Sequence, residues 1–514
     1  MCLLLYVIGT WDWPLVGDAA LIHYVVFLMD HGLAPYRDIV DPNMPTTFLI
    51  QGAVIHAFDG SSLTWRLFDF FLLATTGIAM IAISKPYGRF AGLFAASLFA
   101  LIHGRDGVIQ LGQRDLEMTA FLIIGFAFLF EGLRVLPPER TKVWTTAVFG
   151  FCCGVGATIK PSVLLLAPAI LVMVAITLRR SGRQFRSHVT FGVVGTLIPL
   201  LLVLGYVIHK HVLAPFLGTL FNLIPLFVHL GARSISHLVF HSISSVLLPL
   251  VLIWLVIVFL SNQWLTWERA ALLTGALFGL ASFYMQRKGF PYHRYPSEAF
   301  FLLLIEIDFT TILRSSTKDQ RPALRRVALA GVLIGVLIVG VGSTIHALRQ
   351  DGHNREFEAL LQADLKQLGG NSLDNHVQCM DMADGCIPTL YDMKLVQATG
   401  FLYDCYMFSP VAGAERERYR EGFWTAIQKN PPTIFVVSSN DCEVYPDKPS
   451  YNFTKMSRWP RLNDYLQQNY HFAVQRIPPH MVNWGSSPSK PLGYRIYLRN
   501  EASQGSSLPI ENGR

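Results

Sequence analysis

Acidic side chains occur in two short polar stretches that interrupt a long apolar chain. The first stretch holds Asp18, Asp38 and Asp41, and the second, "HGRDGVIQLGQRDLEM" (103–118), holds Asp106, Asp115 and Glu117. A carboxylate that faces an acceptor hydroxyl or amine can serve as a general base. These residues are therefore candidates for proton abstraction, with Asp18 and Asp115 as the catalytic candidates.

Basic side chains occupy two further polar stretches. "IKPS" (159–162) supplies Lys160, and "QRKGFPYHRYP" (286–296) supplies Arg287, Lys288, His293 and Arg294. Lysine and arginine form charge-assisted hydrogen bonds with phosphate oxygens. If the four stretches meet, they would form a polar cavity that holds a lipid phosphate beside a catalytic carboxylate.

The composition of the chain indicates which structural elements position these residues. Of its 514 residues 52% are hydrophobic and only 15% are charged, against about 25% charged in a typical soluble protein. Apolar runs fill residues 1–347, and ordinary mixed sequence fills 348–514. We therefore predict a polytopic α-helical membrane domain over 1–347, with about 11 spans, and a soluble α/β domain over 348–514. The net charge of +7 comes without a basic stripe interleaved with aromatics, so we predict no nucleic-acid partner.

Ten apolar segments qualify as candidate spans. Before them, "MCLLLYVIGT" is too short to cross a bilayer, and we interpret it as the outer half of a first membrane helix that begins upstream. The ten segments are 66–84, 89–103, 117–133, 143–159, 162–178, 189–208, 245–262, 269–285, 297–313 and 326–347.

Lysine and arginine mark the cytoplasmic side of a membrane protein. Basic connections occur at 85–89, 134–142, 179–186 and 314–326, which is every second connection. The polar stretches and the C-terminal domain then lie outside, as expected for a multi-pass protein of a bacterial inner membrane. The uncharged run 212–232 would invert this order if it spanned, and it contains two prolines, so we predict a re-entrant or interfacial segment.

The first external loop extends from about residue 11 to 65. It begins with a short amphipathic helix over 17–32, followed by "GLAPYRDIVDPNMP" (32–45). Proline fixes φ and stops helices, so this second segment predicts an ordered turn region between two short helices. We expect Tyr36, Arg37 and Asp38 to shape the wall of the cavity.

These motifs resemble a known family. "GD" after the first helix, then "PYRD" and a "P-x-x-P" stretch, resemble the first external loop of GT-C glycosyltransferases, which use polyprenyl-phosphate sugars. The aminoarabinose transferase and protein O-mannosyltransferase group is the most similar. "ATIKPSVLLLAP" (157–168) is similar to that group's lysine turn, and "KGFPYHRYP" (288–296) to its late external loop.

The resemblance, which covers residues 17–347, implies a role for each residue. Asp18 matches the candidate base, although this chain has "GDA" where many relatives have "DE". Asp115 matches an acid that places the acceptor or a metal, and Lys160 matches the lysine near the carrier phosphate. Arg287, Lys288 and His293 would help to hold that phosphate.

Each residue also has a purely structural interpretation. Asp18 would cap the helix that follows it, and Asp38 and Asp41 would cap turns beside Pro42. Asp115 would pair with Arg114, and Lys160 would extend from a helix end to the membrane surface. The four potential cations of 286–296 exceed what such anchoring needs, which favours phosphate binding there.

The C-terminal domain shows an alternation of helix and strand patterns. Residues 354–369 predict a helix, 432–439 a buried strand, 461–477 a helix leading into a strand, and 493–500 a final strand. Cys379, Cys386, Cys405 and Cys442 would form two disulfides in an oxidising compartment, with their pairing open. No catalytic motif occurs here, so we expect the domain to cover the cavity or to bind acceptor.

The sequence therefore predicts an inverting glycosyltransferase with a polyprenyl-phosphate sugar as donor and a glycolipid, polysaccharide or protein as acceptor. We expect no cofactor, with a divalent metal as the alternative, because the acids are scattered. Three other functions remain open: a lipid-linked sugar flippase or transporter, an oligosaccharide ligase with a lipid-diphosphate donor, and a scaffold for envelope assembly. A transporter would favour internal repeats, which the chain lacks.

Overall fold

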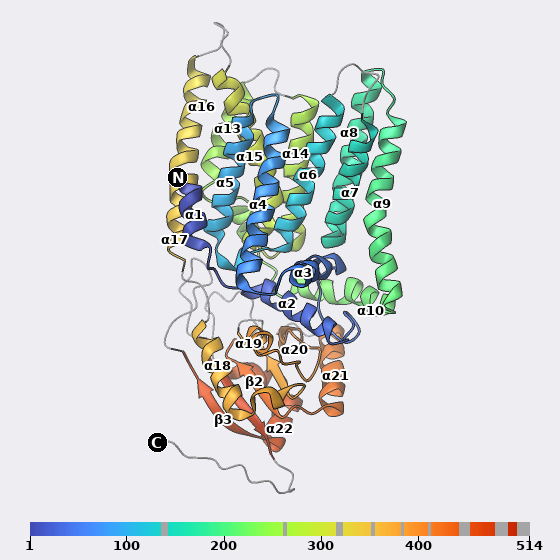
Figure 1. Ribbon diagram of the computed structural model, residues 1–514, viewed down its shortest axis with the longest axis vertical. Helices are drawn as coiled ribbons and strands as arrows, with labels where there is room; N and C mark the ends of the chain where they lie inside the picture. The colour runs from blue at the N-terminus through green and yellow to red at the C-terminus, as the bar shows by residue number, and fades with distance from the viewer. Residues whose placement is uncertain are drawn as a thin grey trace. The chain divides into compact units, whose positions relative to one another are not determined.

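A computed structural model of the protein shows a mostly helical chain (Figure 1). It describes residues 1–134, 142–260, 265–314, 322–350, 355–381, 385–409, 413–440, 453–478 and 492–500. The chain contacts divide it into two compact units. Residues 1–37 and 41–350 form the helical unit, and residues 38–40 join the described residues from 355 onward in the second unit.

Every predicted span coincides with a helical segment. Among the residues that the structure describes, five stretches are long and apolar enough to cross a membrane by length and composition: Ser62–Ser84, Arg114–Arg134, Pro161–Arg180, Arg186–His209 and Pro322–Leu348. After α1 (Cys2–Thr10), the segments are α4 (Ser62–Ser84), α5 (Arg89–Asp106), α6 (Arg114–Arg134), α7 (Val143–Ile159), α8 (Leu166–Arg180), α9 (Arg186–His209), α13 (Leu248–Leu260), α14 (Trp267–Gln286), α15 (Tyr295–Arg314), α16 (Pro322–Ile334), the π-helix η6 (Gly335–Gly342) and α17 (Ser343–Leu348).

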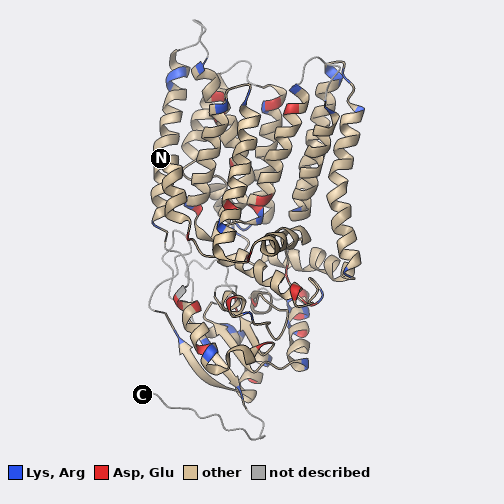
Figure 2. Cartoon of the chain, viewed as in Figure 1, with Lys and Arg blue, Asp and Glu red and all other residues tan. Residues whose placement is uncertain are grey.

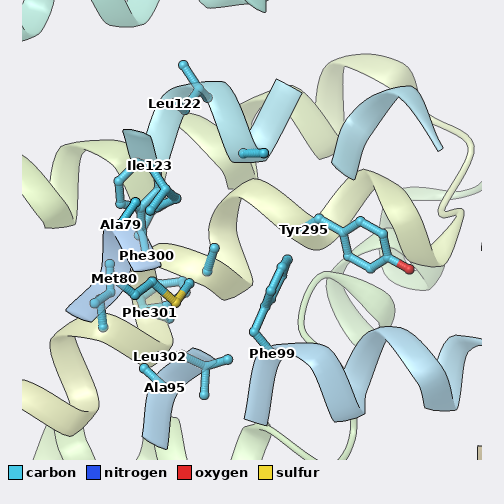
Figure 3. Packing of buried hydrophobic residues seen from close by; sticks show 14 of the residues in the cluster. Ala79, Met80, Ala95, Phe99, Leu122, Ile123, Tyr295, Phe300, Phe301 and Leu302 are labelled. Carbon is cyan, nitrogen blue, oxygen red and sulfur yellow. The ribbon is translucent and has the colours of Figure 1, made fainter. Parts of the chain in front are cut away.

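Helices α6 and α15 form the centre of the helical unit. The residues of α15 from Tyr295 to Phe309 are all buried, and Figure 3 shows Phe300, Phe301 and Leu302 among side chains of α4, α5 and α6. Peripheral helices instead expose large apolar side chains, such as Leu202 of α9 at 66%. An apolar outer surface of this kind suits lipid contact and not water.

Glycines allow α7 and α9 to approach closely. A Cβ atom on Gly150 of α7 would lie 2.0 Å from the carbonyl oxygen of Gly192, and one on Gly195 of α9 would lie 2.1 Å from that of Ala147. Small residues at such contacts are the usual means of packing helices in a membrane. The glycine-rich sequence of both helices therefore explains why they form a tight pair.

Charged residues of the helical unit lie mainly at its two ends (Figure 2). At one end the short helices run across the long ones, with α2, α3 and α10 visible in Figure 1. The segment 212–232, for which we predict a re-entrant or interfacial position, is helical over 213–229, and Figure 1 shows its helix α10 running across the long helices. The bounds are α2 (Gly17–Asp30), α3 (Pro45–Ala57), α10 (Leu213–Gly218), the π-helix η4 (Thr219–Leu223), α11 (Ile224–His229) and α12 (Ile235–His241).

The turn between α2 and α3 has the ordered structure that its prolines predict. Pro45 is the first residue of α3, where its missing N–H costs no hydrogen bond. The carboxylate of Asp41 accepts the backbone N–H of Asn43 at 2.7 Å, which confirms its turn-capping role. Tyr36 adopts a φ of 68°, a left-handed conformation that is uncommon for a bulky residue.

The second unit contains a four-stranded sheet in the order β1-β2-β4-β3. β1 (Val377–Met380) pairs in parallel with β2 (Ile434–Ser438), and β4 (Tyr494–Arg499) runs antiparallel to β2 and to β3 (Tyr470–Arg476). Ile434 lies opposite Leu498 in this register. The helices are α18 (Arg355–Leu368), α19 (Cys386–Met393), α20 (Cys405–Phe408), α21 (Ala414–Lys429) and α22 (Pro460–Asn469).

Two features stabilise this unit beyond its apolar core. Cys379 and Cys386 form a disulfide, and Cys405 is also disulfide-bonded, while Cys442 lies outside the described residues. Lys455 is fully buried, and its ammonium donates to the carboxylate of Asp404 at 2.7 Å and to the carbonyl of Met380 at 2.8 Å. A buried charge needs such partners, so this lysine has a structural role.

Candidate active site

The polar stretches of the helical unit meet around one cavity of about 220 Å³. Its basic or titratable side chains are those of Arg114, Lys160, Lys288 and His293, and most of the remaining wall is apolar. The other lining residues are Pro42, Asn43, Met44, Ile159, Pro161, Ser162, Ile224, Phe227, Val228, Ser282, Met285 and Gln286. A concave, mainly apolar site with a few convergent polar groups is typical of ligand binding.

Lys160 is held where two helices meet. It follows the last residue of α7, and Pro161 begins the next helical turn. Its ammonium lies 2.6 Å from Oδ1 of Asp115 and donates to the side-chain oxygen of Gln286. The side chain is only 12% exposed, so the interpretation as a membrane-surface anchor is wrong. Burial lowers the pKa of Lys160 to about 8, although the neighbouring Asp115 opposes the change.

Lys288 is the second buried ammonium of the cavity. Helix α14 ends before it, with Arg287 in a left-handed conformation at φ 57°. The Lys288 ammonium donates to the carbonyl oxygen of Leu230 at 3.2 Å and lies 4.2 Å from the ring centre of Phe227. Within the described chain it forms no ion pair, and burial lowers its pKa to about 7. A buried cation without an anion is a site where an anionic ligand binds favourably.

Arg114, the first residue of α6, lines the cavity and was considered from the sequence only as a partner of Asp115. In the structure Asp115 forms its ion pair with Lys160, so the expected pair of Asp115 with Arg114 is wrong. Asp18, Asp41 and Asp115 lie close enough for their charges to act on Arg114. Its buried Nε has no hydrogen-bond partner within the described chain, which leaves a donor available at the cavity.

His293 differs from the cation that its position in the sequence suggested. It lies in the short helix η5 (Pro291–Arg294) and lines the cavity. Burial, together with the positive charges of Lys160 and Arg114, holds its pKa well below the usual range. The imidazole is therefore neutral at physiological pH, and its buried Nδ1 has no partner in the part of the chain that the structure describes.

The two catalytic candidates have different surroundings. Asp18 is partly exposed and accepts a hydrogen bond from the hydroxyl of Tyr292 at 3.2 Å. It is the second residue of α2 and caps nothing with its side chain, so the helix-cap interpretation is wrong. Asp115 is fully buried, and its Oδ2 has no partner among the described residues. Neither carboxylate belongs to the cavity lining: Asp18 lies partly exposed beside Tyr292, whereas Asp115 orients the lining residue Lys160.

The structure places the remaining binding candidates away from the cavity lining. Arg294 pairs with Asp106 at 3.0 Å and with Glu298 at 3.4 Å, and these carboxylates raise its pKa against the effect of burial. Arg287 and Arg37 are exposed.

The two other candidates of the first loop have distinct positions. The Tyr36 hydroxyl donates to the carbonyl of Asn43 at 2.7 Å, so Tyr36 shapes the wall through a lining residue. Asp38 belongs to the second unit.

The sequence matches no family model and no curated protein. Solved structures do match. ArnT from Cupriavidus metallidurans, bound to undecaprenyl phosphate, is 13% identical, with 98% of both chains covered and a TM-score of 0.55. The Archaeoglobus fulgidus oligosaccharyltransferase, with an acceptor peptide tethered by a disulfide, is 10% identical over 95% of this chain and 74% of its own, with a TM-score of 0.54.

A third similar structure is the arabinofuranosyltransferase AftD from Mycobacteria. It is 13% identical over 98% of this chain and 40% of its own length, with a TM-score of 0.52. All three are membrane glycosyltransferases of the GT-C type. The protein is thus a multi-pass membrane protein that has the fold of the GT-C glycosyltransferases.

Proposed function

We propose that the protein is an inverting glycosyltransferase that moves a sugar from a polyprenyl phosphate to an envelope acceptor on the outer face of a bacterial inner membrane. The observation that supports this most is the pair of buried ammonium groups, Lys160 and Lys288, beside Arg114 in a mainly apolar cavity. A ligand that suits this wall combines an anionic head with apolar surface. A lipid phosphate has both properties.

The charges of the cavity favour a phosphate as the leaving group. Lys288 has no carboxylate partner in the described chain, and Arg114 has an unused Nε donor. In the transfer step, the bond between the sugar and the phosphate oxygen breaks while the acceptor oxygen or nitrogen bonds to the anomeric carbon. The lipid phosphate leaves with the electron pair, and cations that bind its developing charge lower the barrier.

Asp18 is the general base in this proposal, and it takes the proton of the acceptor. Its partial exposure and its hydrogen bond from Tyr292 keep the carboxylate oriented and accessible. General-base catalysis contributes about 10²- to 10⁴-fold. Asp115 holds Lys160 in position, and the neutral His293 supplies a further hydrogen-bonding group at the phosphate.

The proposal extends to the whole chain. In this proposal the protein has about 11 membrane spans. Its C-terminal soluble α/β domain lies on the extracytoplasmic side and contributes to acceptor binding. We propose that no metal is obligatory, because Arg114 already places a positive charge among Asp18, Asp41 and Asp115. The acceptor is a glycolipid, a polysaccharide or a protein.

A second candidate is an oligosaccharide ligase with a lipid-diphosphate donor. The likeness to the archaeal oligosaccharyltransferase favours it. The end-to-end match with ArnT and the small size of the cavity support the monophosphate donor more strongly.

The experiment is transfer of radiolabelled sugar from polyprenyl-phosphate and polyprenyl-diphosphate donors to bacterial envelope fractions by the purified protein. We expect transfer from a monophosphate donor, with loss in Asp18→Asn and retention in Asp12→Asn, an exposed acid of the same loop. Transfer from diphosphate donors alone would favour the ligase. Movement of labelled lipid across proteoliposomes without any transfer would favour the flippase.

A further inference from the structure

A group of charged and polar side chains is buried in the helical unit, and none of them belongs to the cavity lining. It consists of Arg66 and Asp69 on α4, His103 on α5 and Tyr295 at the start of α15, all with 0% exposure. A guanidinium nitrogen of Arg66 lies 2.5 Å from Oδ2 of Asp69, and His103 Nε2 lies 3.0 Å from Oδ1 of Asp69. His103 Nδ1 lies 2.9 Å from the hydroxyl of Tyr295.

The Asp69 carboxylate is the common acceptor of this group. An ionised carboxylate only accepts hydrogen bonds, so His103 must carry a proton on Nε2 to donate to Asp69. The other ring nitrogen of His103, Nδ1, bonds to the Tyr295 hydroxyl, so the imidazole links Asp69 to Tyr295.

Asp69 also holds the backbone of the segment before α6 through a hydrogen bond to Gly112. Its Oδ1 accepts the backbone N–H of Gly112 at 2.8 Å, and the indole of Trp65, one turn earlier on α4, donates to the carbonyl of Leu111 at 3.1 Å. Gly112 has a φ of 55°, and a Cβ atom there would lie 2.5 Å from the Trp65 ring. The backbone is thus clamped two residues before the cavity residue Arg114.

Tyr295, the last residue of this hydrogen-bonded series, lies at the end of the polar stretch 286–296. Tyr295 directly follows η5, which carries the cavity residue His293 and Tyr292, the donor to Asp18. Figure 3 shows the Tyr295 ring beside Phe99, with its hydroxyl pointing away from the apolar cluster. Through His103, Asp69 therefore restrains the segment that orients the proposed base.

We propose that Asp69 is a positioning residue that preorganises the active site by restraining two segments at once: Gly112–Asp115 directly, and Tyr292–Tyr295 through His103. This inference rests on the proposed glycosyl transfer. An ion pair that served only to bury Arg66 would need neither the Gly112 amide nor the His103 imidazole. Both additional partners belong to segments that lead to the site.

The proposal predicts a larger loss of turnover than of donor binding, because η5 carries the cavity residue His293 as well as Tyr292, the donor to Asp18. Lys160 and Lys288 bind Asp115, Gln286 and Leu230, and no residue of the buried group. Removing the Tyr295 hydroxyl therefore leaves the phosphate-binding ammonium groups in place but frees η5 and, with it, the orientation of Asp18. Misplacement of a reacting group by about 1 Å can cost about 10²-fold in rate.

The experiment compares Tyr295→Phe and His103→Gln with wild type, because both variants keep the Arg66–Asp69 pair. We expect kcat to fall at least about 10-fold while the donor KM changes by a smaller factor. Tyr87→Phe is the matched control: it removes a part-buried tyrosine hydroxyl that donates to Glu268, a residue outside the proposed site. It should leave kcat unchanged.

Hydrogen exchange makes the test independent of activity. The amides of Tyr292–Tyr295 should exchange faster in His103→Gln than in wild type, whereas the Gly112 amide, which donates directly to Asp69, should keep its protection. All of these amides should exchange equally fast in Tyr87→Phe and wild type. If wild type transfers no sugar, the proposed function fails while exchange still tests the positioning role. Unchanged exchange in His103→Gln, or an unchanged kcat in Tyr295→Phe, would overturn the inference.

Discussion

Replacement of Lys160 by methionine separates phosphate binding from the stability of a buried ion pair. Lys160→Met keeps most of the side-chain volume but removes the charge that lies 2.6 Å from Asp115. Asp115 is fully buried, and breaking a buried pair by removing one partner costs about 3–5 kcal/mol of stability. We therefore expect a lower unfolding temperature in this variant.

The effect on ligand binding has a different origin and a different size. A hydrogen bond to a charged group contributes about 1.5–3 kcal/mol, which corresponds to a change of about 10- to 100-fold in Kd. The assay is equilibrium binding of polyprenyl phosphate to the protein in lipid nanodiscs. Lys142→Met is the matched control, since Lys142 is exposed and precedes the first residue of the same helix, α7.

A double variant decides between the two roles. Lys160→Met/Asp115→Asn removes the stranded carboxylate, so stability should recover while affinity stays low. If affinity recovered together with stability, Lys160 would act only as the structural partner of Asp115, and the reasoning for a phosphate site would fail.

Three further predictions follow from the same contacts. Asp18→Asn should lower kcat about 10²- to 10⁴-fold at unchanged phosphate affinity, whereas Asp115→Asn should weaken phosphate binding, because Lys160 loses the carboxylate that holds it in position; the opposite pattern in kinetics and binding would exchange their roles. Phosphate affinity should fall as pH rises from about 6.5 to 9, because the ammonium forms bind the anion and burial lowers the pKa of Lys288 to about 7 and of Lys160 to about 8. In Lys288→Arg, the fall in affinity near pH 7 should disappear. A wild-type affinity that stays constant up to about pH 9 would contradict the prediction. Cys379→Ser/Cys386→Ser should destabilise the second unit by about 2–3 kcal/mol, as expected for a short closed loop, and should leave sugar-phosphate binding by the helical unit unchanged. An unchanged unfolding transition of the second unit would show that this disulfide does not contribute to its stability.

The apolar helices could be predicted because a membrane imposes simple requirements. A span needs a long apolar run, and every predicted run coincides with a helix. Two elements of the second unit, β1 and α21, were missed for local reasons. The buried strand β1 has only four residues, one of them the buried Gln378. Helix α21 is polar over most of its surface and buries only Arg420, Phe423 and Ile427.

The site residues were predictable by type but not by partner. Sequence spacing brought Lys160 and Lys288 forward as cations, and both line the cavity. Their partners come from residues 45 and 58 positions away, Asp115 and Leu230, and no local pattern specifies such pairs. The buried group around Asp69 was missed. Arg66 and Asp69 lie three residues apart at the start of an apolar helix, which is a local signal, but His103 and Tyr295 come from other helices and join them only in the folded unit.

The most direct test of the central claim is a structure of the protein in nanodiscs with bound polyprenyl phosphate. The account predicts that the phosphate lies in the cavity, with its oxygens about 3 Å from the ammonium nitrogens of Lys160 and Lys288 and within reach of Arg114. Density for the phosphate at another place, with the cavity free of lipid, would contradict the assignment of this cavity as the donor site.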